Sequence, residues 1–379
     1  MILPVGDSPN PEGTPVATYC LLAVNVAVYL LTLPLAWASP DASDPRLAEY
    51  VHLVARHTGY KASIPQILAN TSAYDLLVFS WGYRPVDPSL VTLFASMFLH
   101  AGFAHLAGNM LFLWIYGDNV EHRVGPLRFV AYYLVSGAAA TLVHAMFFPT
   151  SGLPMVGASG AISGVLGFYF LWFPRNRVHL LLLFPFLMRI TVSARTLLGL
   201  YIVVENVFPF ILARGATGVA YGAHIGGFVA GLLIAKAIDW RTLNAPPAGY
   251  TAGASAVTSG GLREAIAAGR FADAARIYFA LPAESTRRLL TPQESLSLGD
   301  WLLADGQPRA ALSLYRRHLR DHPSGSSAAA AHLGAGLVQM RHLNQPTAAY
   351  QHFLEALDLD PSPATALAAK HALADLGAR

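Results

Sequence analysis

The sequence has little charge for its length. Only 12% of its 379 residues are Asp, Glu, Lys or Arg, about half of the share usual in soluble globular proteins, and 54% are hydrophobic. So few charges cannot cover a soluble protein of this size, so several stretches are expected to face lipid. Residues 1–240 carry 23 charges and the shorter stretch 241–379 carries 24. The composition predicts a membrane domain followed by a soluble one.

Cysteine and clustered positive charge are also scarce. Cys20 is the single cysteine, which excludes an intrachain disulfide framework and a cysteine-ligated metal site. The net charge is +3 and no run of Lys and Arg occurs, so nothing indicates a nucleic acid partner. The pattern His-Glu-x-x-His is absent, which argues against a metalloprotease. We expect no metal and no cofactor.

Apolar runs are the most prominent feature that is present. The first lacks a preceding Lys or Arg, so it reads as a retained helix rather than a cleaved signal peptide. Residues 39–90 are interrupted by prolines and are expected to form a loop with short interfacial helices. Residues 178–188 are too short to span a bilayer and are expected at the interface or as an extension of the fifth helix. Six runs are candidate transmembrane helices: 16–38, 91–116, 127–148, 157–173, 196–212 and 217–238.

Basic residues are unevenly distributed over the short loops. If the N-terminus is cytoplasmic, the inside segments hold eight Lys or Arg and the short outside loops hold only Arg214. The long first loop holds four more, but long translocated loops weigh less in this rule. Both termini are therefore predicted to be cytoplasmic. The eight inside residues are Arg123, Arg128, Arg175, Arg177, Arg189, Arg195, Lys236 and Arg241.

The C-terminal third changes character after a linker at 241–261 that is rich in small residues and proline. Residues 262–379 then show a helical pattern that repeats at an interval of 38 residues. The pattern resembles two to three tetratricopeptide (TPR) repeats, which stack helix hairpins into a partner-binding surface; the alternative is an unrelated helical domain. The matching positions are Leu298, Gly299, Leu302, Ala311, Tyr315 and Pro323, then Ala349, Phe353, Ala356 and Pro361, with Leu333-Gly334 slightly out of register.

Three clusters of polar residues interrupt the apolar runs. They span His100 to Asn109 at the second run, Gly157 to Gly160 at the start of the fourth, and Ala223 to Gly227 in the sixth. Polar groups inside a membrane are costly and are candidates for function. Within the first cluster His105 and Asn109 are four residues apart, and therefore lie on one helical face.

Small residues recur around two of these polar groups. Around Ser159 they are Gly160, Gly164 and Gly167, and around His224 they are Gly222 and Gly226, and also Ala223, Gly227 and Gly231. Such faces let two transmembrane backbones approach closely, which would bring Ser159 within reach of His224. A lone serine, histidine or glycine face has an ordinary structural explanation; the combination favours chemistry.

A serine beside a histidine is the arrangement of a nucleophile and its general base. The reaction also needs donors for an oxyanion, and the backbone N–H of Ser159 and the Asn109 amide are candidates. No aspartate is evident as a third member, and burying a carboxylate in lipid is costly, so a Ser-His dyad is favoured over a triad.

Residues 90–235 closely resemble the rhomboid family of intramembrane serine proteases. The resemblance implies a six-helix core with Ser159 as nucleophile and His224 as base, in a water-filled cavity open to the outside. It implies Asn109 and His105 as oxyanion partners, and for Glu121 a structural role in tying the second helix to the loop before the third. The matching stretches are Phe98-Leu99-His100 with His105-Leu106 and Asn109-Met110, Gly117 to Glu121 with Gly125, Gly157 to Gly164, and Val219 to Gly227.

Two positions depart from the family pattern. Some members have a tyrosine four residues after the nucleophile that packs on the histidine; here Ser163 stands there, so other contacts must orient His224. In the fifth helix, where relatives often show a glutamine, this chain has Glu205-Asn206. The sequence assigns no role to Glu205.

The whole sequence thus predicts an all-α polytopic membrane protein with a six-helix rhomboid-like bundle (1–240), a linker (241–261) and a soluble TPR-like domain (262–379). The expected activity is serine endopeptidase cleavage of transmembrane protein substrates near the outer face of a bacterial inner membrane. The expected partners are these substrates, membrane lipid and a cytoplasmic protein bound by the repeats.

One alternative is a non-catalytic relative that binds transmembrane clients and uses its repeats as a scaffold. A transporter is disfavoured because no inverted repeat relates the halves. An intramembrane aspartyl protease is disfavoured because only Asp118 lies near an apolar run.

Overall fold

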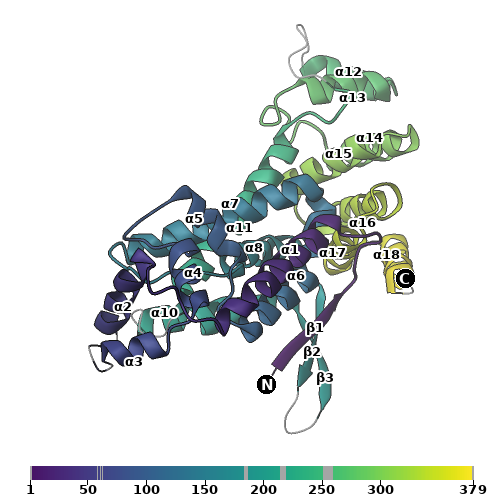
Figure 1. Cartoon of the computed structure of the whole chain (residues 1–379). Helices are drawn as coiled ribbons and strands as arrows, with labels where there is room; N and C mark the ends of the chain where they lie inside the picture. Colours follow the sequence, from purple (N-terminus) through teal and green to yellow (C-terminus); the bar gives the residue numbers. More distant parts are fainter. Residues whose placement is uncertain are drawn as a thin grey trace. The chain divides into compact units, whose positions relative to one another are not determined.

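The structure is a computed structural model that describes residues 2–57, 59, 61, 63–182, 187–213, 219–250 and 259–377. Its chain forms two compact units (Figure 1). The first unit comprises Met1–Gly6, Thr14–Leu171 and Val178–Ile234, and the second comprises Asp7–Gly13, Trp172–Arg177 and Ala235–Arg379. The last segment of the second unit therefore begins six residues before the sequence-based boundary between residues 240 and 241.

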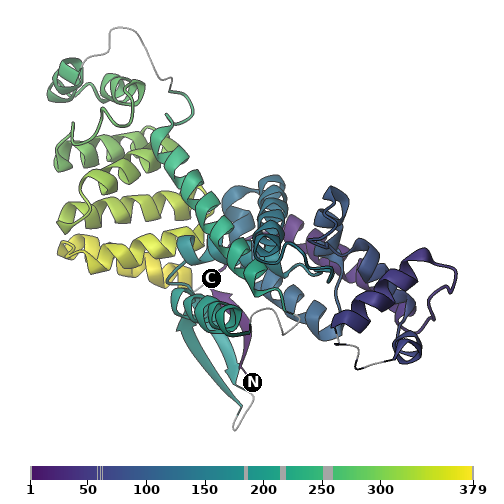
Figure 2. The same cartoon turned by 90° about the vertical axis from the view of Figure 1, so that its left-hand side faces the viewer.

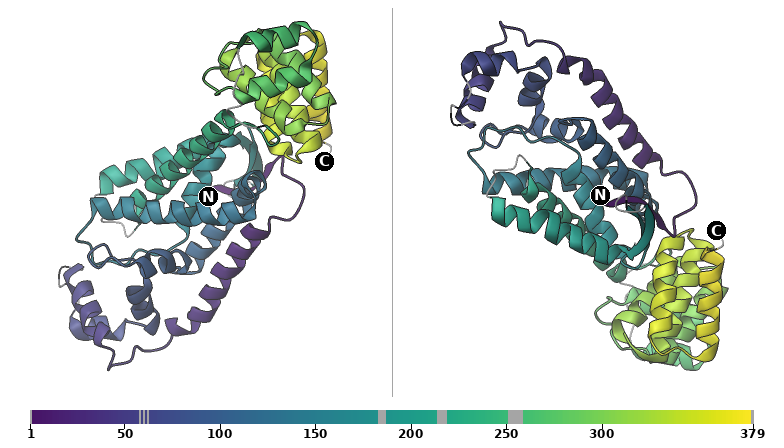
Figure 3. Two further views of the ribbon diagram at one scale, coloured as in Figure 1. Left: turned by 90° about the horizontal axis from the view of Figure 1, so that it is seen from above. Right: turned by 90° about the horizontal axis from the view of Figure 1, so that it is seen from below.

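Residues 2–244 are mostly helical, and the long helices of the first unit run in roughly similar directions (Figure 3). The elements in chain order are β1 (Ile2–Ser8), α1 (Val16–Thr32), η1 (Leu33–Ala36), α2 (Pro45–His57), α3 (Ile64–Ala69), α4 (Ala73–Trp81), α5 (Leu90–Ala95), η2 (Ser96–Phe98), α6 (Phe103–Val124), α7 (Pro126–Phe147), α8 (Ser159–Trp172), β2 (Arg177–Leu182), β3 (Met188–Ser193), α9 (Ala194–Ile202), η3 (Val203–Val207), α10 (Phe208–Ala213) and α11 (Tyr221–Asn244).

Among the described residues, four helices are long and apolar enough to cross a membrane. They are Val16–Ala36, Pro126–Phe147, Ala194–Leu212 and Tyr221–Asn244. The expected second span is instead two helical pieces, Leu90–Phe98 and Phe103–Val124, bent by 89° at the break between them. The expected fourth span is the 14-residue helix α8, which is shorter than a typical transmembrane helix. Six apolar runs thus correspond to four full-length candidates, one broken pair and one short helix.

The proline-rich stretch 39–90 does contain short helices, as expected. α2, α3 and α4 all lie within it, and α3 and α4 each begin with a capping box, at Ser63 and Ser72. A capping box satisfies backbone N–H groups that have no intrahelical partner, so these serines fix where the two helices begin.

The prediction that residues 178–188 extend the fifth helix was wrong. The stretch contributes to strands β2 and β3, which join β1 in a three-stranded sheet of order β1-β2-β3 (Figure 1). The protein is therefore not all-α. A short apolar run cannot be assigned to helix or strand from its periodicity alone. The β-branched residues Ile190, Thr191 and Val192, which come just after the run, favour a strand.

Glu121 anchors the N-terminus of α1. The side chain is 3% exposed, and its carboxylate accepts hydrogen bonds from the backbone N–H groups of Ala17 (2.9 Å) and Thr18 (2.7 Å) and from the Thr18 hydroxyl (2.8 Å). A carboxylate at a helix N-terminus is stabilised by the free N–H groups and by the helix dipole. These contacts tie α6 to α1, and the expected contact of Glu121 with the loop before the third helix stays a prediction.

The helices of the second unit stack in successive layers (Figure 2). They are α12 (Ser259–Ala267), α13 (Phe271–Ala280), α14 (Pro292–Ala304), α15 (Pro308–Asp321), α16 (Gly325–His342), α17 (Pro346–Asp358) and α18 (Pro363–Gly377). A Cβ on Gly299 would lie 2.6 Å from the Tyr315 ring, and one on Gly336 would lie 2.5 Å from the Phe353 ring. The same glycine-to-aromatic contact thus recurs in two successive helix pairs, with Gly336 rather than Gly334 as the second glycine.

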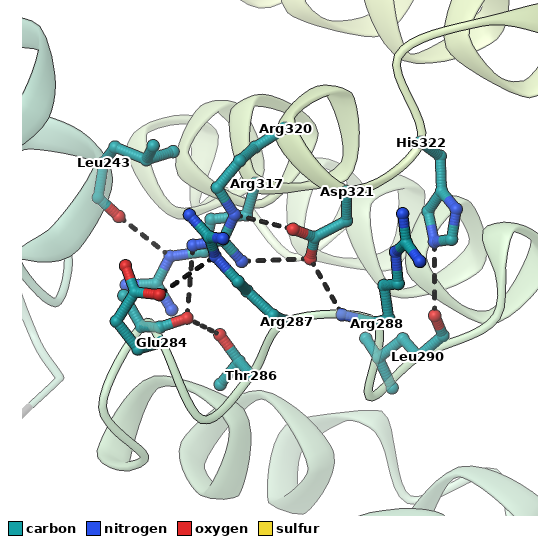
Figure 4. A network of polar contacts seen from close by, with 11 residues as sticks. Leu243, Glu284, Thr286, Arg287, Arg288, Leu290, Arg317, Arg320, Asp321 and His322 are labelled. Carbon is teal, nitrogen blue, oxygen red and sulfur yellow. Dashed lines mark hydrogen bonds and ion pairs between the residues drawn. The ribbon is translucent and has the colours of Figure 1, made fainter.

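The end of α11 is held within the second unit. Arg317 of α15 donates to the carbonyl oxygen of Leu243 at 3.1 Å (Figure 4). It also donates to the carbonyl oxygen of Ala245 at 3.3 Å, and its guanidinium lies over the Phe279 ring. Nearby, the Asp321 carboxylate pairs with Arg320 at 2.6 Å and accepts from the backbone N–H of Arg288 at 3.2 Å. Leu243 and Ala245, near the start of the expected linker 241–261, therefore contact α15; residues 251–258 lie outside the described residues.

Candidate active site

The backbones of helices α8 and α11 lie in direct contact, with almost no side chains between them. A Cβ on Gly227 would overlap the carbonyl oxygen of Gly160, and a Cβ on Gly231 would overlap that of Gly164. Only glycine permits backbones this close, as the small-residue spacing of both helices predicted. The close approach sets the separation of the two helices that carry Ser159 and His224.

The second small-residue face of α11 has a different partner. A Cβ on Gly226 would lie 2.7 Å from Val143, and one on Gly222 would lie 3.0 Å from His144, both on α7. The glycines around His224 therefore form two faces, of which Ala223, Gly227 and Gly231 face α8 while Gly222 and Gly226 face α7. This division holds α11 against two helices at once.

Ser159 and His224 are in hydrogen-bonding contact. The Ser159 Oγ lies 2.8 Å from His224 Nε2. Ser159 is the first residue of α8, and the first backbone hydrogen bond of this helix runs from the Ile162 N–H to the Ala158 carbonyl oxygen. The backbone N–H of Ser159 therefore has no carbonyl partner one turn earlier in the helix. The two residues are 65 positions apart in the sequence, and the packing of α8 against α11 brings them together.

His224 has a second partner that the sequence did not identify. Its Nδ1 lies 2.6 Å from Oδ1 of Asn206, which is 1% exposed and belongs to the π-helix η3. The departure at Ser163 indicated that other contacts must orient His224, and Asn206 is such a contact. The only sign of this contact in the sequence was the polar pair Glu205-Asn206 within an apolar run. The two side chains differ in burial, because Asn206 is buried and Glu205 is exposed.

Asn109 and His105 face the residues before Ser159. Gly157 has φ +121°, and a Cβ there would lie 2.8 Å from His105 Nε2 and 3.7 Å from Asn109 Nδ2. Gly157 therefore supplies both a backbone conformation that other residues rarely adopt and the room for two polar side chains. Asn109 Nδ2 is buried and makes no hydrogen bond among the described residues. The amide is thus free to donate to a group that enters beside Ser159.

A cavity of about 610 Å³ opens at these residues. Ser159, His224, His105 and Asn109 line it together with mainly apolar side chains such as Met155. A few convergent polar groups in an otherwise apolar cavity are typical of a binding site. No group of three or more His, Cys, Asp or Glu that could hold a metal ion occurs in the described part of the chain.

The comparisons with known proteins agree with this part of the chain. Residues 87–241 match the family model described as Rhomboid domain. The Rhomboid protease GluP of Bacillus subtilis is 34% identical over 140 residues, 37% of this chain and 24% of that protein. Rhomboid protein 1, mitochondrial, of Saccharomyces cerevisiae is 32% identical over 159 residues, 40% of this chain and 44% of that protein. The Rhomboid protease AarA of Providencia stuartii is 27% identical over 240 residues, 59% of this chain and 73% of that protein.

The chain spans less than half the length of the first two of these relatives. Two of the three are named as proteases, which supports protease activity at the level of the family. The apolar helices support an integral membrane protein. Together with the motifs and the fold, these relatives support the rhomboid family as the family of residues 87–241.

Proposed function

We propose that this protein is an intramembrane serine endopeptidase in which Ser159 is the nucleophile and His224 the general base. The observation that carries the proposal is the 2.8 Å contact between Ser159 Oγ and His224 Nε2 at the wall of an apolar cavity. This contact joins two helices whose packing depends on glycine, so the geometry is built into the fold rather than into a mobile loop.

The reaction follows from these positions. His224 Nε2 takes the hydroxyl proton as Ser159 Oγ bonds to the carbonyl carbon of the substrate. The oxyanion then accepts hydrogen bonds from Asn109 Nδ2 and the Ser159 N–H, with His105 beside them. When the peptide C–N bond breaks, His224 returns the proton to the leaving amine. Water, deprotonated by His224, then hydrolyses the acyl-enzyme and regenerates Ser159.

The substrates we propose are transmembrane segments of other proteins. A peptide bond in a helix is screened by its own hydrogen bonds, so a segment must unwind before its carbonyl can reach Ser159. Small or helix-breaking residues lower the cost of that unwinding. Segments with such residues near the outer face should therefore be cut in preference to uniform leucine helices.

Covalent labelling tests the proposal most directly. A serine-directed fluorophosphonate should label the purified protein at Ser159, because an activated hydroxyl attacks phosphorus and expels fluoride. Ser159→Ala should remove the label, and His224→Ala should slow it strongly. Equal labelling of the wild type and Ser159→Ala would assign the reactivity to another residue.

A non-catalytic scaffold is the second candidate. Helices α12–α18 stack in layers, and the recurring glycine-to-aromatic contacts support a TPR-like domain that binds a cytoplasmic protein. The paired Ser159 and His224 favour the protease, since a pure scaffold needs neither. The two functions are compatible if the repeats recruit a partner.

We propose a bacterial plasma membrane location with both termini in the cytoplasm, following the eight inside basic residues against one outside. Protease added to sealed, right-side-out vesicles should leave the C-terminal tail intact until detergent is added. Digestion of the tail in intact vesicles would reverse the topology.

A further inference from the structure

The hydrogen-bond pattern at Asn206 fixes the state of the His224 ring. Asn206 Nδ2 donates to the carbonyl oxygen of Tyr201 at 3.1 Å, and a carbonyl can only accept, which identifies the other amide atom as the oxygen. That oxygen, 2.6 Å from His224 Nδ1, must accept a hydrogen from the ring. The neutral imidazole therefore carries its hydrogen on Nδ1 and presents the lone pair of Nε2 to Ser159.

The backbone at Asn206 is unusual in a way that serves this contact. Residues Val203–Val207 form a π-helix between α9 and α10, and Asn206 is its one buried residue. A π-turn adds a residue to the turn and rotates the side chains that follow, and such turns occur often at functional sites. Here the turn leaves Glu205 exposed while Asn206 faces His224.

We propose that Asn206 is a positioning residue that holds His224 in the tautomer and orientation of a general base. The proposal rests on the proposed protease function and deepens it, adding to the Ser-His dyad a third residue that orients the histidine and takes no proton. In serine proteases an acceptor on the second ring nitrogen does this work. An amide oxygen does it without the cost of a carboxylate inside the membrane. Asn206 thus supplies the orientation that an aromatic residue at position 163 would otherwise provide.

Two substitutions separate this role from a structural one. Asn206→Leu has a similar shape but no acceptor, so kcat for a reporter transmembrane substrate should fall about 10²–10⁴-fold with little change in KM, the usual size of a general-base contribution. Asn206→Asp keeps an acceptor for His224 but loses the donor to Tyr201, so it should retain most of the rate. Asn206→Ala is a second variant without an acceptor, for use if the leucine variant does not fold. Glu205→Gln, from the same turn, is the matched control and should cleave like the wild type.

A spectroscopic readout follows the tautomer itself. In ¹⁵N NMR of histidine-labelled protein, His224 should show a protonated Nδ1 and an unprotonated Nε2 in the wild type, and a population protonated on Nε2 in Asn206→Leu. Wild-type kcat in Asn206→Leu, or equal losses in the leucine and aspartate variants, would overturn the positioning role while leaving the protease function intact. Cleavage that survives Ser159→Ala would refute the protease function, and the positioning role with it.

Discussion

Ser159→Ala and His224→Ala should each abolish cleavage of a reporter transmembrane substrate while the protein stays folded. Both side chains line the cavity, and the proposed mechanism uses the 2.8 Å hydrogen bond between them to activate the nucleophile. Removing either one leaves no nucleophile or no base, so the two losses should be similar in size and not additive in the double variant. The measurement is turnover in detergent or reconstituted vesicles, with thermal melting to verify folding.

Two further variants are expected to retain more turnover than Ser159→Ala and His224→Ala. Ser163→Ala makes the same change one helical turn along α8, at a buried position outside the cavity lining, and should leave turnover near the wild-type level. Asn109→Ala removes one of the proposed oxyanion donors, and loss of such a donor typically costs about 10²–10³-fold in turnover. Wild-type turnover in Ser159→Ala would move the active site elsewhere, and wild-type turnover in Asn109→Ala would remove that residue from the oxyanion role.

Much of the site could be predicted from the sequence because its determinants are local. The four-residue spacing of Gly227 and Gly231 marks a face for close helix packing, and that face is where α11 meets α8. The polar residues Ser159, His224 and Asn109 were visible because each interrupts an apolar run. The structure brings these three to one cavity.

Asn206 could not be assigned because its direction depends on a π-turn. In the sequence, Glu205 and Asn206 are equivalent polar residues in an apolar run, and only the extra residue in the turn decides which one is buried. A charged residue in a membrane is costly, which makes Glu205 the more obvious candidate from the sequence, but its side chain is exposed and the hydrogen bond to His224 Nδ1 comes from Asn206.

The fold outside the site was less predictable where long-range pairing decides it. Strand β2 pairs with β3, its neighbour in the chain, and also with β1, more than 160 residues earlier, and no local signal reports such a distant partner. The 89° break before α6 lies at residues 99–102, around His100, and in the sequence that polar interruption was interpreted as a sign of function and not of a bend. Helix ends with local caps, such as Ser72 for α4, are the opposite case, because the determinants lie within four residues.

Gly227→Leu should abolish the proposed protease activity although residue 227 takes no part in the proposed chemistry. Even the Cβ would overlap the carbonyl oxygen of Gly160, a backbone atom that cannot move aside, so α11 must move away from α8. That shift carries His224 away from Ser159, and a displacement of about 1 Å at a reacting pair can cost 10²-fold in rate. Gly227→Ala places the same Cβ with less bulk and should show a smaller loss in the same direction.

Gly199 provides the matched control for this substitution. It also lies in an apolar helix, but a Cβ there would meet only Phe170, at an ordinary 3.7 Å. Gly199→Ala should therefore leave both turnover and fluorophosphonate labelling near the wild-type level, whereas Gly227→Ala and Gly227→Leu should reduce both. Because labelling needs the Ser159–His224 contact but no substrate binding, parallel losses in the two assays assign the defect to helix separation. Wild-type labelling in Gly227→Leu would show that the spacing of α8 and α11 does not control the nucleophile.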